Sequence, residues 1–109
     1  MDNSIGGFCE RFVDEFLSID GKKLSYPIGR IDCRRIIFYN CNLAVLEEIR
    51  DISKRIFSEK GHNINIHLFP TLNTHERIPL DLLGEGSYPV DIGWFFSVGE
   101  VIDSRYQPT

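Results

Sequence analysis

Hydrophobic side chains recur at helical spacing in two segments of the chain. In residues 4–21 the stripe consists of Phe8, Phe12, Val13 and Phe16, and Gly21 follows as a suitable stop. The acidic residues of this segment lie away from the stripe. We therefore expect a first helix that packs its phenylalanine face onto a sheet.

A second helical pattern runs from residue 40 to residue 61. Asn40 or Asn42 can cap its start, and Gly61 suits its end. The expected buried stripe is Val45, Leu46, Ile49, Ile52, Ile56 and Phe57. Charges three or four residues apart on the outer side predict ion pairs along the helix. These are Glu47 with Arg50, and Asp51 with Lys54 and Arg55.

Strands are predicted on both sides of that second helix. Residues 36–39 are apolar on both alternating faces, which is typical of a central strand covered on two sides. A short strand and a turn at 27–29 precede them. Residues 62–69 alternate, with Ile64, Ile66 and Leu68 on one face. A strand, a helix and a strand in close order predict a right-handed crossover, so these two strands should be parallel.

The period-2 pattern of residues 90–98 predicts another strand, with Trp94 and Phe96 in the core. Phe95 points to the opposite face, where either the first helix covers it or it is an exposed anchor. Gly99 and Glu100 suit a two-residue hairpin turn into a last strand at 101–106. The expected fold is one α+β domain over residues 1–109. It has a single-layer mixed sheet of about five strands, two main helices, one βαβ crossover and a C-terminal β-hairpin.

The composition is that of a folded globular domain, because 42% of the 109 residues are hydrophobic and 26% are charged. Cys9, Cys33 and Cys41 are an odd number without CxxC spacing, which favours reduced thiols. The first residues lack the pattern of a signal peptide, and no apolar run approaches the roughly 20 residues of a membrane span. We therefore expect a soluble cytoplasmic protein.

No motif in the chain indicates catalysis or a cofactor. The segment "GEGS" is followed by an expected strand and lacks the GK[ST] of a phosphate loop. His62 and His67 should point to opposite faces of their strand, so a zinc site would need His75 and Glu76 to fold back onto His67. A free cysteine usually behaves as a small buried hydrophobe. We therefore expect no enzyme, no cofactor and no metal.

Charge is distributed unevenly around a net value of −4. The bases of residues 22–35 are Lys22, Lys23, Arg30, Arg34 and Arg35. They either keep an exposed strand edge soluble or contact phosphates, and the second alternative describes a nucleic-acid-binding or regulatory accessory module. Residues 78–104 contain five acids and no lysine or arginine. This segment is either a solubilising surface or a recognition face for a basic protein.

The segment "DLLGEGSYPVDIGWFF", with the small size, acidity and α+β layout, resembles the small immunity proteins that bacteria make against toxins, including those of contact-dependent inhibition. The resemblance implies a cytosolic inhibitor that binds a cognate toxin domain, often a basic nuclease, and occludes its active site. Steering by charge and burial of a few anchors would provide the binding. We expect the contact face to comprise Asp81, Glu85, Tyr88, Asp91 and Phe95, with Glu100 and Asp103 at its rim.

Overall fold

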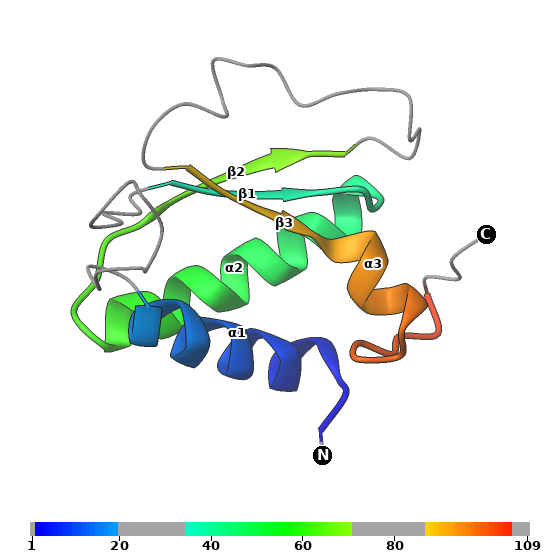
Figure 1. Ribbon diagram of the computed structural model, residues 1–109, viewed down its shortest axis with the longest axis horizontal. Coiled ribbons are helices and arrows are strands. Elements are labelled where there is room, and N and C mark those ends of the chain that lie inside the picture. Colours follow the sequence, from blue (N-terminus) through cyan, green and yellow to red (C-terminus); the bar gives the residue numbers. More distant parts are fainter. Residues whose placement is uncertain (1, 20–34, 71–86, 106–109) are drawn as a thin grey trace, which may run out of the picture.

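The computed structural model describes residues 2–19, 35–70 and 87–105. Its elements are α1 (Ile5–Ile19), β1 (Arg35–Tyr39), α2 (Leu43–Glu59), β2 (Asn65–Phe69), β3 (Ser87–Asp91) and α3 (Ile92–Ser97). Both long helices lie on the same face of the sheet, and α3 continues from the end of β3 (Figure 1). The combination of helices and a sheet agrees with the predicted α+β class.

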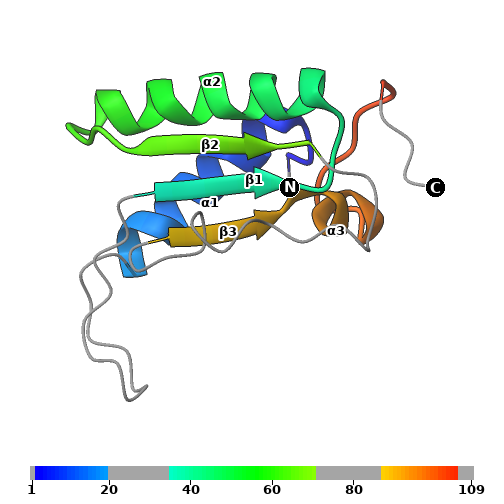
Figure 2. The same ribbon diagram turned by 90° about the horizontal axis from the view of Figure 1, so that it is seen from above.

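The sheet has the order β2-β1-β3, and both strand pairs are parallel (Figure 2). The position of β1 in the middle confirms the central strand that its apolar faces predicted, and Ile36, Ile37 and Phe38 are all buried. The parallel pairing of β1 with β2 through α2 confirms the predicted βαβ connection. At the carboxyl end of the sheet, Tyr39 lies opposite both Phe69 and Asp91.

Helix α2 has clear signals at both ends. The Asn42 side chain accepts a hydrogen bond from the Val45 backbone N–H at 2.9 Å, so Asn42 is the N-cap. At the other end Gly61 has a φ of +82°, and the His62 N–H donates to the Phe57 carbonyl at 2.8 Å. A left-handed glycine with this hydrogen bond forms a Schellman motif. Of the two predicted candidates, Asn42 and not Asn40 is therefore the N-cap, and Gly61 is confirmed as the residue that ends the helix.

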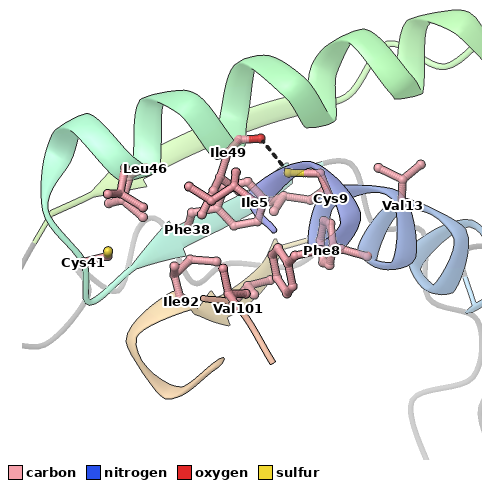
Figure 3. Close-up of a cluster of buried hydrophobic side chains, with 14 of the residues drawn as sticks. Ile5, Phe8, Cys9, Val13, Phe38, Cys41, Leu46, Ile49, Ile92 and Val101 are labelled. Atoms are coloured by element: carbon pink, nitrogen blue, oxygen red, sulfur yellow. Dashed lines mark hydrogen bonds between the residues drawn. The ribbon is translucent and has the colours of Figure 1, made fainter. Parts of the chain in front are cut away.

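The core lies between the sheet and the two long helices (Figure 3). The phenylalanine stripe of α1 faces the sheet as predicted, with ring centroids of Phe12 and Phe38 5.4 Å apart. Phe16 meets Phe57 of α2 at 5.5 Å, edge to face. Such aromatic pairs add to the stabilisation from burial of their area. α1 therefore packs on both the sheet and α2.

The predicted strand over 90–98 and the C-terminal hairpin are wrong. Strand β3 ends at Asp91, and residues 92–97 form α3. Ile92 and Phe96 are buried, and two residues four apart satisfy a helical period as well as a strand period. Local capping decides between the two periods, because the Asp91 carboxylate accepts from the Trp94 N–H at 2.9 Å. Gly99, at φ +77°, ends the short helix instead of opening a hairpin.

Other parts of the expected fold have mixed outcomes. The sheet has three strands in the described ranges, all parallel, so neither five strands nor a mixed sheet is confirmed. The expected strand and turn before residue 35 lie outside those ranges.

The predicted ion pairs along α2 do not form between the described residues; Arg50 instead contacts Asp51 at 3.0 Å. Lys60 contacts Asp14 of α1 at 3.5 Å. In the described ranges, no helix has the length and apolar character that crossing a membrane requires.

Candidate functional site

The carboxyl end of the sheet is where two strands lead directly into capped helices. Asn42 caps α2 after β1, and Asp91, the last residue of β3, caps α3. Both helices end in a Schellman motif; in α3 the Glu100 N–H donates to the Phe95 carbonyl at 3.0 Å. The β1–α2 and β3–α3 units therefore bring the polar cap residues and the short aromatic helix α3 to the same end of the molecule (Figure 1).

A hydrogen bond between Asn40 and Asp91 joins these two units. The Asn40 Nδ2 donates to the Asp91 Oδ1 at 2.9 Å, and the same oxygen accepts from the Trp94 N–H. Asn40 has a φ of +63°, a left-handed conformation that asparagine tolerates better than most residues. Gly93 lies directly against Asn40. The corner after β1 thus fixes the start of α3.

Three residues of the expected contact face serve the fold. Tyr88 and Phe95 are half-buried: the Tyr88 ring lies 5.4 Å from the Phe16 ring, and the Phe95 ring lies 5.0 Å from the Phe8 ring. The second distance answers the question about Phe95, because the first helix covers it in part. Asp91 is occupied as a cap. Asp81 and Glu85 lie outside the described residues.

Trp94, expected in the core, is 53% exposed, so that expectation is wrong. In a strand Trp94 would share a face with Ile92 and Phe96, whereas in a helix Ile92 and Phe96 share a face and Trp94 points in another direction. Phe96 is buried as expected. The indole packs edge to face on Phe95, with ring centroids 5.2 Å apart. Of these two neighbouring aromatic residues, Trp94 is therefore exposed and Phe95 is partly buried.

The two expected rim acids differ in their surroundings. Glu100 is exposed and makes no ion pair with the described residues, and its backbone carbonyl accepts from Arg11 at 3.0 Å. Asp103 contacts Arg105 at 2.6 Å, and hydrogen bonds from Arg105 lower the pKa of Asp103 to about 2. Arg105 also reaches Glu48 of α2 at 2.6 Å. Arg105 is therefore held between two carboxylates.

Further exposed hydrophobic residues lie near Trp94. The large exposed hydrophobics of the described ranges are Leu43, Trp94, Val98 and Ile102. Leu43, Val98 and Ile102 are not among the residues that the sequence predicts for the contact face. The spacing of Trp94 and Val98, four apart, would have placed them on one side of a helix, but only if residues 92–97 had been assigned as a helix.

The cysteines in the described ranges are unsuited to nucleophilic chemistry. Cys9 and Cys41 are free and fully buried. Burial raises the pKa of Cys9 to about 11, and its Sγ donates to the Ile49 carbonyl at 3.6 Å (Figure 3). The buried Ser53 hydroxyl makes no well-formed hydrogen bond, although its proximity to the thiol opposes part of this rise. A protonated thiol in a closed core is a poor nucleophile.

Metal ligands do not gather in the described part of the chain, where no three His, Cys, Asp or Glu side chains form a group. His62 and His67 are both exposed, and His75 lies outside the described residues. Of the expected basic cluster, only Arg35 is described, at the start of β1. No family model matches the chain, and no curated protein or solved structure matches it either.

Proposed function

We propose that the chain is a cytosolic immunity protein that binds and neutralises a cognate toxin domain. In this proposal an acidic surface containing an aromatic side chain covers the active site of a basic domain, such as a nuclease. The observation that carries the proposal is the exposed Trp94 at an end of the molecule where Glu47 and Glu100 make no ion pair with the described residues. Exposed tryptophan is enriched at the energetic centres of protein interfaces.

The electrostatics of this end favour a positively charged partner. Arg105 is engaged by Asp103 and Glu48, and Arg11 donates to the backbone carbonyls of Asp2 and Glu100. The Glu47 and Glu100 carboxylates make no ion pair with the described residues, in a chain of net charge −4. Such a surface accelerates the encounter with a basic protein, and added salt weakens the electrostatic attraction between them.

A direct test takes the neighbouring open reading frame, where this proposal expects the toxin, purifies its C-terminal domain and titrates it against this protein in calorimetry. The double variant Glu47→Lys, Glu100→Lys should bind that domain at least about tenfold more weakly. Glu59→Lys is the matched control, since Glu59 is an exposed acid at the opposite end of α2 and should tolerate the change. A second double variant, Asp81→Lys with Glu85→Lys, tests the remaining expected contacts.

Growth of cells that express the toxin domain supplies the functional readout. Wild-type protein and Glu59→Lys should protect these cells, and the Glu47, Glu100 double variant should not. Failure of the wild-type protein to bind or protect would overturn the proposed function. Equal binding by all variants would place the contact elsewhere and remove the acidic surface from the proposal.

A further inference from the structure

The large exposed hydrophobic residues are concentrated at one end of the described structure. Trp94, Val98 and Ile102 are 53%, 48% and 63% exposed and fall within nine successive residues, 94–102. The fourth, Leu43, begins α2 directly after the Asn40 corner that holds α3. Singly scattered exposed hydrophobics are normal, but a concentration of this kind marks an interaction surface. We call Trp94, Val98 and Ile102 the α3 surface.

The backbone beneath the α3 surface is held in place. Val101, between the exposed residues, is buried. The Ile102 N–H donates to the Asn3 carbonyl at 2.8 Å, and the Asn3 side chain donates to the Gly99 carbonyl at 3.1 Å. These contacts fix the segment after α3 to the beginning of α1. The exposure of its hydrophobic side chains is thus a feature of an ordered backbone.

The start of α3 is equally fixed. Asn40 and Asp91 hold the first turn, and Gly93 packs directly against Asn40. Side chains on a pre-ordered backbone lose less conformational freedom on binding than those on a loose segment. Trp94 and Val98, one turn apart, are therefore presented together on the same side of a rigid support.

Charge decides what kind of surface can cover these residues. Glu100, which lies between Val98 and Ile102 in the sequence, makes no ion pair with any described residue, and its backbone carbonyl accepts from Arg11 at 3.0 Å. Asp103, the residue after Ile102, is paired with Arg105. A twofold symmetric dimer through this surface would place Glu100 of both copies in one interface, and these like charges oppose self-association. A basic surface with an apolar pocket would neutralise the acid and cover the indole at the same time.

We propose that the α3 surface is the anchor of partner binding and takes a basic protein surface with an apolar pocket for Trp94. This inference rests on the proposed function in assuming a protein partner, and it names the side chains that enter that partner. Trp94 fills the pocket, Val98 and Ile102 pack at its margin, and Glu100 meets Lys or Arg around it.

Synthetic peptides test this chemistry without the toxin. Three peptides of equal length are used: an amphipathic Leu-Lys peptide, a Leu-Glu peptide of the same pattern, and a Gly-Lys peptide. The Leu-Lys peptide should shift the emission of Trp94, the single tryptophan of the chain, to shorter wavelength. The Leu-Glu peptide should not bind, and the Gly-Lys peptide should bind at least about tenfold more weakly. Equal binding of Leu-Lys and Gly-Lys would overturn the apolar anchor.

Variants locate the binding on the molecule. Trp94→Ala, followed by calorimetry with the Leu-Lys peptide, should lose at least about tenfold in affinity, as should Ile102→Glu. His67→Ala, an exposed truncation on β2, is the control and should bind as the wild-type protein does. Circular dichroism confirms folding of each variant. Undiminished binding by Trp94→Ala would overturn the inference.

Two further measurements separate this inference from the proposed function. A toxin domain that binds wild-type protein and Trp94→Ala equally would leave the immunity function standing and remove the α3 surface from it. Conversely, peptide binding that needs Trp94, with no binding to the toxin domain, would keep the surface and remove the toxin. Sedimentation analysis that shows a dimer abolished by Trp94→Ala would overturn the basic partner in favour of a second copy.

Discussion

Gly93 lies so close to Asn40 that a Cβ atom at position 93 would overlap the Asn40 carbonyl oxygen. The same Cβ would be 2.6 Å from the Asn40 side-chain nitrogen, which donates to Asp91. Carbon atoms do not approach these groups so closely without displacing them. The contact between β1 and α3 therefore requires glycine at this position, for lack of space and not for its backbone angles.

Gly93→Ala should consequently destabilise the protein. The backbone of Asn40 has to move, and such overpacking typically costs about 1–3 kcal/mol. Gly6→Ala is the matched control, because a Cβ at position 6 of α1 would meet only the Ser4 hydroxyl at 3.9 Å. Alanine there should stabilise the helix by about 0.5–1 kcal/mol. Urea unfolding measures both, and equal stability of Gly93→Ala and wild type would contradict the close contact.

The predictable elements of this fold were those with a sustained hydrophobic pattern, above all α2, which also has recognisable residues at both ends. The Asn42 cap, Gly61 and four buried stripe positions agree on α2, with Ile52 and Ile56 partly buried against the same core. The alternation of Ile66 and Leu68 agrees with β2. Residues 92–97 gave no such agreement. Alternating aromatic residues there fit a strand, whereas the deciding hydrogen bond from Trp94 to Asp91 depends on where β3 ends.

The same ambiguity determined how much of the candidate site could be predicted. Acidity at this end of the chain was visible in the sequence, and Glu100 is exposed. The choice of aromatic anchor depended on the period: a strand would bury Trp94, whereas α3 exposes it and turns Phe95 toward Phe8. Leu43 and Ile102 lie far apart in sequence, so only the fold could bring their elements to one end.

Fluorescence of the single tryptophan distinguishes the two arrangements. Since Trp94 is half exposed, its emission should already be shifted to long wavelength in the native protein, and acrylamide should quench it efficiently. Unfolding in guanidinium should change the emission maximum only slightly. A short-wavelength, poorly quenched emission would show a buried indole and contradict the exposed position on α3. The variant Phe95→Leu removes the ring that packs on Trp94, and its emission shows how much this ring contact contributes to the spectrum.

Stability should fall at alkaline pH because of Cys9. Burial raises the pKa of its thiol from 9.0 to about 11, so the folded state holds this proton more tightly than the unfolded state. The resulting stabilisation is complete below pH 9 and is lost as the pH rises to about 11, by about 2–3 kcal/mol.

Chemical unfolding at a series of pH values, compared with Cys9→Ala, checks this expectation. The variant has a cavity and lower stability throughout, but its stability should decline less between pH 9 and pH 11. The raised pKa of Tyr39, caused by burial and by Asp91, contributes to the decline in both proteins and cancels in the comparison. Parallel curves for the two proteins would show that Cys9 ionises as freely when folded as when unfolded.

The side chain and the backbone conformation of Asn40 should make separately measurable contributions to the free energy of unfolding. Asn40→Gly keeps the φ of +63° without strain but loses the hydrogen bond to the Asp91 carboxylate, so we expect a net loss of about 1 kcal/mol. Asn40→Ala loses the same bond and keeps the unfavourable conformation, which should cost about 1 kcal/mol more. Urea unfolding should therefore rank wild type above Asn40→Gly and Asn40→Gly above Asn40→Ala. If Asn40→Gly were as stable as wild type, the bond to Asp91 would contribute nothing beyond the conformational strain that glycine relieves.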